Sequence, residues 1–357
     1  MAYGSVSVDS SVTSWGDTTA GLYGFKNRII NGAMMIDQRA AGNAVTVTSN
    51  LGYFSCDRYT SISSQPSKFS MQQTTTAPAG FSNSLKCAVV SAYTPVSSEG
   101  FGFIQIIEGY NVADLNWGTA NAKAVTVSFQ VQSSVTGTYS FFLMNSANNR
   151  SYPVSYTISS ANTWTTVSAT IPGDTTGTWL TTNGSGLWVG FILSAASGGL
   201  GPSGAWAGAS YYGATGTNTT WSATSGATFY ITGVQLEKGT TATSFDVRPY
   251  GTELSLCQRY YETSASAGTA PADGVYSFAS SGANANSIGG LWYSYHWITF
   301  KVNKRISTPT MTFYGSSGNL QWLNNGSWTT LSSVSIPTGD STAVQSDNGV
   351  TFRAGTT

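Results

Sequence analysis

The fold is decided by the stretch Val125-Thr126-Val127-Ser128-Phe129-Gln130-Val131-Gln132, in which apolar and polar residues alternate without a break. Successive side chains of a β-strand point to opposite faces, so this stretch has one apolar face and one face of hydroxyls and amides. A helix would instead need apolar residues three or four positions apart. The pattern predicts a half-buried strand in a layered β-structure.

Further strands are expected on both sides of this one. Runs with strand-like patterns are separated by Gly, Pro, Asn and Asp, which are typical turn residues. These runs cover residues 67–72, 85–92, 101–107, 139–144, 163–171, 186–193 and 227–236. Many short antiparallel strands predict an all-β fold of the sandwich or jelly-roll kind.

One segment breaks the β pattern. Within residues 252–261, Leu254, Cys257 and Tyr261 recur at the spacing of one helical face. We expect a short helix there, with Thr252 as a candidate N-cap.

The helix follows a turn-like sequence at residues 248–251, which favours a domain boundary. Beyond it, residues 291–300 alternate but place large apolar side chains on both faces, as in a strand covered on both sides. We therefore expect three parts: an N-terminal attachment arm over 1–24, a jelly-roll domain over 25–250, and a smaller β domain over 251–357 that begins with the helix.

The composition excludes several classes of protein. Only 8% of the 357 residues are charged and the net charge is zero, whereas 40% are hydrophobic. Disorder needs the opposite balance, so the chain should fold. Nucleic-acid binding needs many cations to neutralise phosphates. The densest basic cluster, Lys301, Lys304 and Arg305, is too small for that, and we interpret it as a solvated strand end.

The sequence contains few residues from which a catalytic or metal-binding site could be built. His296 is the single histidine, and a nucleophile activated by histidine would have no other base. Cys56, Cys87 and Cys257 are far apart and lack the spacing of a zinc site or a disulfide framework. We expect no enzyme, no metal and no cofactor. A structural calcium ion is conceivable, although no typical calcium loop is present. Fifteen acidic residues leave a carboxylate-based polysaccharide depolymerase open as an alternative.

Recognition has better candidates. The glycine-rich stretch 196–228 contains Trp206, Tyr211, Tyr212 and Trp221, whose aromatic faces suit sugar rings. The same four residues would also serve to anchor a long loop to the sandwich. A second pair of candidates, Trp322 and Trp328, flanks the sequence Asn-Asn-Gly at 324–326, which predicts a hairpin.

Several segments resemble a known family. The stretch Asn27-Arg28-Ile29-Ile30-Asn31-Gly32-Ala33-Met34-Met35-Ile36-Asp37-Gln38-Arg39 is similar to the opening of a jelly-roll domain in tail-fibre and other virion-appendage proteins of bacteriophages. Residues matching the middle, the close and the following small β domain of those proteins lie at 164, 170–179, 233–239, 242–245, 248–249, 258–261 and 306–314. The resemblance spans about residues 25–315 and is to turn and core residues more than to a site.

The resemblance implies a virion fibre or spike subunit with a domain like a carbohydrate-binding module, often a homotrimer. We therefore expect contact with a host surface polysaccharide and attachment to other virion proteins through residues 1–24. A purely structural virion component, such as a head decoration, head spike or tail adaptor, is the alternative. The chain shows no signal-peptide pattern and no apolar run long enough to span a membrane. We expect it to be made in the host cytoplasm and to reside in the virion.

Overall fold

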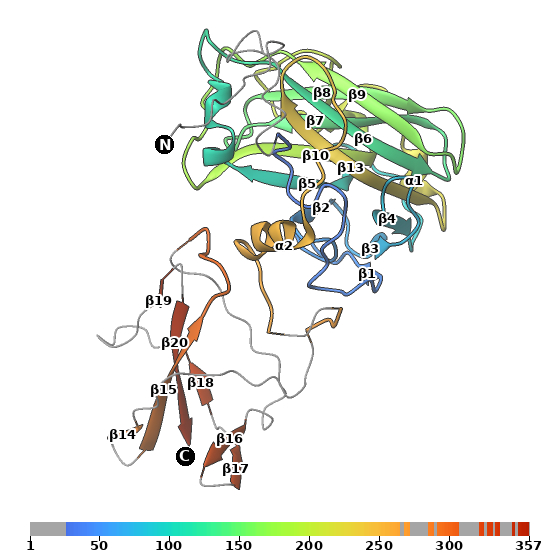
Figure 1. The fold of residues 1–357 in the computed structure, drawn as a ribbon. Helices are drawn as coiled ribbons and strands as arrows, with labels where there is room; N and C mark the ends of the chain where they lie inside the picture. The colour runs from blue at the N-terminus through green and yellow to red at the C-terminus, as the bar shows by residue number, and fades with distance from the viewer. Residues whose placement is uncertain are drawn as a thin grey trace, which may run out of the picture.

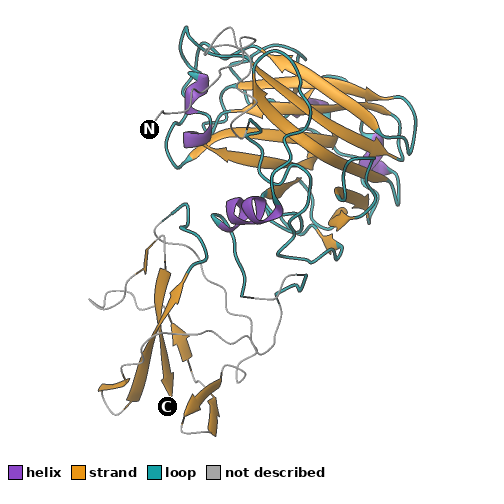
Figure 2. Cartoon of the chain, in the orientation of Figure 1, coloured by secondary structure: helices purple, strands orange, loops and turns teal. Residues whose placement is uncertain are grey.

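The computed structural model describes residues 26–264, 268–271, 285–288, 291–306, 321–324, 327–330, 333–335, 345–346 and 349–356. The arm expected over 1–24 and most of the segment 306–314 lie outside the described residues. Strands make up most of the regular secondary structure in the described chain, and helices are confined to short segments (Figure 2).

Two antiparallel sheets form the main domain (Figure 1). The first has the spatial order β1 (Val45–Thr46), β3 (Phe69–Thr74), β4 (Ser84–Val89), β13 (Thr228–Lys238), β6 (Val125–Ser133) and β9 (Thr165–Ile171). The second has the order β2 (Tyr59–Ser63), β5 (Gly100–Glu108), β10 (Ser185–Ala195), β7 (Gly137–Met144) and β8 (Ser151–Ile158). The chain crosses repeatedly between the sheets, so the domain is a jelly-roll sandwich. The predicted fold class is confirmed.

The core lies between the sheets. Phe129 of β6 contacts Phe191 of β10 edge to face with 5.1 Å between ring centroids, and Phe229 of β13 lies 6.4 Å from Phe103 of β5. All four rings are buried. The apolar face predicted for 125–132 therefore points inward, and its register with β13 runs from Lys238 opposite Val125 to Phe229 opposite Ser133, interrupted by a bulge.

All the predicted strands of this domain are present within a few residues, but three further strands of the two sheets were missed. These are β1, at one edge of the first sheet, and β2 and β8, the two edge strands of the second sheet. β8 contains Pro153, a residue that sheets tolerate at their edges because it donates no ladder hydrogen bond. Edge strands are less apolar than central ones, and the alternation signal is correspondingly weak.

The predicted helix is present as α2 (Tyr250–Gln258). Two details differ. Its N-cap position is Pro249 and not Thr252, and the helix ends before Tyr261. Cys257 is buried against Ile30 and Ile36, so α2 packs on the segment that opens the jelly roll (Figure 1).

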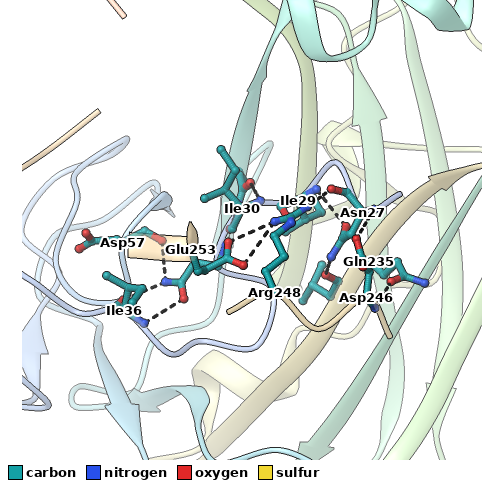
Figure 3. A network of polar contacts seen from close by, with 12 residues as sticks. Asn27, Ile29, Ile30, Ile36, Asp57, Gln235, Asp246, Arg248 and Glu253 are labelled. Carbon is teal, nitrogen blue, oxygen red and sulfur yellow. Dashed lines mark hydrogen bonds and ion pairs between the residues drawn. The ribbon is translucent and has the colours of Figure 1, made fainter. Parts of the chain in front are cut away.

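A polar network closes the sandwich and holds α2 in place (Figure 3). Arg248 donates to the carbonyl of Ile29 at 2.9 Å and forms an ion pair with Glu253 at 3.2 Å. Glu253 in turn accepts the backbone N–H of Asn31. Asn27 accepts the N–H of Leu236 and donates to the carbonyl of Val234, both at 3.0 Å. Several residues that carry the family resemblance therefore bond to one another and have a structural role.

The other described elements are short. In the main domain they are the 3₁₀ turns η1 (Gly109–Asn111), η2 (Ala113–Leu115) and η3 (Ser197–Gly199), the strands β11 (Leu200–Gly201) and β12 (Gly213–Ala214), and the helix α1 (Thr220–Ala223). Towards the C-terminus they are β14 (Ala285–Ile288), β15 (Leu291–Thr299), β16 (Gln321–Asn324), β17 (Ser327–Thr330), β18 (Ser333–Ser335), β19 (Gln345–Ser346) and β20 (Gly349–Thr356). β15 corresponds to the strand predicted over 291–300, with His296 opposite Phe352 of β20. The boundary at 250/251 stays a prediction.

Candidate functional site

A groove of about 650 Å³ opens where the five-stranded sheet meets the end of α2. Ile106 and Glu108 of β5 belong to the outer face of that sheet, away from the core. Around them the groove is lined by Arg39, Tyr53, Asp57 and Arg58 from the first part of the chain, by Gly184 and Ser185, by Cys257, Arg259, Tyr260 and Tyr261 at the end of α2, and by Lys304, Arg305 and Ile306.

Arginine–tyrosine stacking organises this groove. The guanidinium carbon of Arg39 lies 3.5 Å from the ring centroid of Tyr261 and 5.0 Å from that of Tyr53. The guanidinium carbon of Arg58 lies 3.4 Å from the ring centroid of Tyr260. Cations are attracted to aromatic faces, so these contacts fix both arginines.

The negative charge of Glu108 is balanced by a neighbouring cation within the groove. Its carboxylate accepts two hydrogen bonds from Arg259, at 2.7 and 3.0 Å, and one from the hydroxyl of Tyr260 at 2.8 Å. Burial alone would raise the pKa of Glu108, but the hydrogen bonds from Arg259 and Tyr260 outweigh it and hold the pKa below its ordinary value. Glu108 is therefore an ionised structural partner.

Asp57 is in a different state. Its carboxyl is buried and accepts hydrogen bonds from the backbone N–H and the side-chain amide of Gln38. Burial dominates, and the pKa of Asp57 is raised to about 6 despite those hydrogen bonds. The groove thus contains one carboxylate held ionised and one that titrates near pH 6.

The predicted solvated strand end at 301–305 is wrong for Lys304. Its side chain is buried, donates to the carbonyl of Gln258 at 2.6 Å and forms an ion pair with Glu262 at 2.5 Å. Burial lowers its pKa. The backbone N–H of Arg305 donates to the carbonyl of Arg259, and its guanidinium donates to the carbonyl of Asn183 at 2.9 Å. These contacts place residues 304–306 along one wall of the groove.

Trp188 borders the groove. It is the cross-strand partner of Ile106, so both side chains share the outer face of the five-stranded sheet. Its ring is half-buried, and its N–H donates to the hydroxyl of Ser185, a groove residue, at 2.5 Å. Trp188 therefore offers an aromatic surface beside two residues that line the groove.

Trp206, predicted as a ligand residue, belongs to a cluster of tryptophans elsewhere. Its ring centroid lies 5.3 Å from that of Trp117 and 5.5 Å from that of Trp179. Its N–H donates to the carbonyl of Pro172 at 2.7 Å. These contacts anchor the loop that carries Trp206, which is the alternative considered above for this loop.

Tyr211 and Tyr212 also pack against the sandwich. Tyr212 joins the apolar cluster on the outer face of the five-stranded sheet, and its hydroxyl donates to the carbonyl of Ser98. The ring of Tyr211 lies so close to Gly201 that a Cβ there would meet it at 2.1 Å. Both rings are half-buried. The loop therefore folds back over part of this face.

Trp221 needs a correction. It lies in α1, is fully buried and meets Phe69 edge to face at 6.0 Å, so its ring offers no face to a sugar. The hairpin predicted around 324–326 is confirmed by the antiparallel pairing of β16 and β17. In it Trp322 stands opposite Thr329 and Trp328 opposite Leu323. Their proposed role stays a prediction.

Sequence reasoning missed the groove because its residues come from distant segments that carry no common motif. The sequence Gln258-Arg259-Tyr260-Tyr261, with a cation beside two tyrosines at a helix end, was the one local signal. Among the described residues no group of three or more metal-ligating side chains occurs. None of the helices in the described part of the chain is long and apolar enough to cross a membrane.

No protein-family model matches the sequence, and no curated protein matches it either. Solved structures show distant similarity. The enzymatically active domain of tailspike protein 4 from bacteriophage CBA120 is 12% identical, with a TM-score of 0.31, over 60% of this chain and 22% of that one. The match therefore spans less than a quarter of the tailspike chain.

Two carbohydrate-binding modules are similar over nearly their whole length. The family 11 module from Clostridium thermocellum, solved with a mixed-linked tetrasaccharide, is 12% identical over 56% of this chain and 98% of that one, with a TM-score of 0.30. The CBM22-1 xylan-binding domain of Xyn10C from Paenibacillus barcinonensis is 11% identical over 57% and 99%, with a TM-score of 0.27. These scores are low, and the jelly-roll assignment rests on the strand order and pairing described above.

Proposed function

We propose that this chain is a fibre or spike subunit of a bacteriophage virion that binds a host surface polysaccharide without cleaving it, and that the groove is its glycan-binding site. One observation carries the binding part: aromatic surfaces and hydrogen-bond donors converge in a single groove on the outer face of the sandwich. Such a combination is typical of sites for polar, ring-shaped ligands.

The groove offers both kinds of contact that a sugar needs. Tyr53 is 41% exposed, and Trp188 adds a half-buried aromatic surface at the border. The C–H faces of a sugar ring pack on such surfaces. Arg39, Arg58 and Arg305 supply N–H donors for hydroxyl and carboxyl oxygens.

The groove favours binding over hydrolysis. A glycosidase needs one carboxyl group that can deliver a proton to the glycosidic oxygen and a second that is free to attack or to activate water. Glu108 is engaged by Arg259 and Tyr260, and Asp57 is buried and held by Gln38. We therefore propose no catalytic residue in the groove, and the proposed binding needs neither a metal nor a cofactor. A depolymerase would release new reducing ends from bacterial capsule, and incubation of the protein with capsule tests this.

The virion part of the proposal rests on the family resemblance of the segments between residues 25 and 315. It includes homotrimerisation, attachment to other virion proteins through residues 1–24, and localisation in the particle. A purely structural role as a head decoration, head spike or tail adaptor is the alternative. Imaging virions labelled on this chain would distinguish the fibre or spike from the purely structural component, because a fibre or spike places the label on a host-facing appendage. The mass of the intact assembly tests the trimer.

The binding proposal is tested with an array of bacterial surface polysaccharides. We expect the wild-type protein to bind at least one of them, and Tyr53→Ala to weaken that binding at least fivefold. Tyr110→Ala is the matched control, because Tyr110 is 63% exposed and lies outside the groove. Absence of binding by the folded wild-type protein, or equal weakening by both variants, would refute the proposal.

A further inference from the structure

The groove concentrates positive charge in a chain that has no net charge. The whole sequence contains 15 Lys and Arg residues and 15 Asp and Glu residues. Five of these cations line the groove, namely Arg39, Arg58, Arg259, Lys304 and Arg305. The lining contains two acids, Asp57 and Glu108. One third of the basic residues therefore gather at a single site.

Two of the five cations are already neutralised. Arg259 is paired with Glu108 at 2.7 Å, and Lys304 is paired with Glu262 at 2.5 Å. Arg39 and Arg58 form no ion pair with any carboxylate in the described part of the chain. The positive charge left in the groove is thus carried by Arg39, Arg58 and Arg305, and the Asp57 carboxyl, which Arg39 affects without forming an ion pair, offsets only part of it.

Arg58 is held as a preformed donor. The residue is 5% exposed, one of its terminal nitrogens donates to the carbonyl of Ile106, and its Nε–H is buried without an acceptor. Its backbone has a φ of +77°, in the left-handed region that non-glycine residues rarely adopt. Burying a cation that forms no ion pair is costly. A strained backbone conformation persists where the surrounding structure fixes it, often at ligand sites.

Arg39 has the same incomplete bonding. Its guanidinium stacks on Tyr261 and also lies over Tyr53, and its Nε–H is buried without an acceptor. Stacking occupies the faces of the guanidinium plane and leaves its N–H edge as the free part. That edge is the fork that binds the two oxygens of a planar carboxylate side by side.

We infer that the ligand of the groove is an acidic polysaccharide, and that Arg39 and Arg58 bind the carboxylate of a uronic or other acidic sugar in it. This inference rests on the proposed function, since it names the class of glycan for the same groove. The carboxylate supplies the missing anionic partner, while Tyr53 and Trp188 contact the sugar ring. Lysine would supply charge without the planar fork, so the inference assigns the role to arginine as such.

The test compares acidic oligosaccharides with neutral versions of the same chains. Oligogalacturonate, oligomannuronate and oligosialic acid are titrated into the full-length protein by calorimetry at 150 mM salt, alongside each oligosaccharide after chemical reduction of its carboxyl groups. We expect at least one acidic oligosaccharide to bind at least tenfold more tightly than its reduced form. Equal binding of the acidic and reduced forms would overturn the acidic specificity and leave glycan binding standing. No binding of any of them, together with no signal on the polysaccharide array, would overturn both proposals.

Variants assign the effect to the arginines. Arg58→Lys keeps the charge and removes the fork, and Arg39→Gln removes the charge at a half-buried position where misfolding is less of a concern. Each should weaken acidic binding at least tenfold and leave binding of the reduced form within twofold. Lys68→Gln removes a cation outside the groove and should change neither. An effect of Lys68→Gln equal to that of Arg39→Gln would show non-specific attraction and overturn the inference. Circular dichroism confirms folding of each variant.

Discussion

Arg248 and Glu253 form a buried ion pair that locks the end of the jelly roll to its beginning. The side chains are 4% and 10% exposed, and 3.2 Å separates Nη1 of Arg248 from Oε1 of Glu253. The same arginine bonds the carbonyls of Asn27 and Ile29 (Figure 3). Because α2 begins at Tyr250, this pair also fixes the helix whose far end lines the groove.

Replacing Arg248 by methionine should lower the free energy of unfolding by about 3 to 5 kcal/mol, because it leaves the Glu253 carboxylate buried without its partner. Urea denaturation measures this. Lys238→Met is the control, since the pair of Lys238 with Asp114 is exposed and should contribute less than about 1 kcal/mol. Similar losses in the two variants would contradict the structural role of the Arg248 pair.

Gly102→Ala should destabilise the sandwich strongly, because a Cβ on Gly102 would lie 2.0 Å from the carbonyl oxygen of Phe191 on the neighbouring strand. The strands must separate to admit it, and we expect a loss of about 1 to 3 kcal/mol. Gly251→Ala is the matched change in α2, where a Cβ meets nothing within 4 Å. It should stabilise by about 0.5 to 1 kcal/mol, since alanine favours helices. Thermal denaturation of both variants measures the contrast.

Much of the fold was readable from the sequence because local chemistry determined it. The alternation in 125–132 predicted β6 and its inward face, and the helical spacing of Leu254 and Cys257 predicted α2. The edge strands β2 and β8 were not found. β2 is largely buried, but Thr60, Ser61 and Ser63 leave it without an apolar pattern, whereas β8 is exposed at Ser155 and Thr157. The N-cap was misplaced at Thr252 because propensity alone does not show where tertiary contacts begin a helix.

The candidate site was much less predictable. The stretch 196–228, which carries Trp206 and Trp221, has the composition expected of a sugar-contacting loop. Whether an aromatic ring is exposed or packed, however, depends on residues far away in the chain. Arg39 and Tyr261 are separated by most of the jelly roll in sequence and meet in the fold at 3.5 Å. No spacing rule links them, so such a groove becomes visible only with tertiary structure.

Trp206→Ala separates packing from ligand binding in the predicted loop. Loss of its contacts with Trp117 and Trp179 should lower the free energy of unfolding by about 2 kcal/mol, below the range for a fully buried tryptophan because Trp206 is half-buried. Polysaccharide affinity should stay within twofold of wild type. Tyr53→Ala should show the reverse pattern, with weaker binding and little change in stability. A Trp206→Ala protein that is stable but does not bind polysaccharide would show that the binding site lies in the loop and not in the groove.

Asp57 should make the protein less stable as the pH rises from about 4 to about 6. Its pKa is about 6 in the folded protein against an ordinary value of 3.8, chiefly because the carboxyl is buried. Between these values the folded state binds the proton more tightly than the unfolded chain, so folding takes up protons and raising the pH opposes it. At about 1.4 kcal/mol per unit, the loss from this group is at most about 3 kcal/mol.

Asp57→Asn isolates this effect, because an amide does not titrate. The free energy of unfolding of both proteins is measured by urea denaturation from pH 4.5 to 7. Glu108 and Asp174 have lowered pKa values, since burial, which alone would raise them, is outweighed by hydrogen bonds from Arg259 and Arg150. Their contribution is lost only as the pH falls through the acidic range, and both proteins share it. The stability of the variant relative to wild type should therefore rise by about 2 kcal/mol between pH 4.5 and 6.5, and a constant difference would show that Asp57 is ionised throughout.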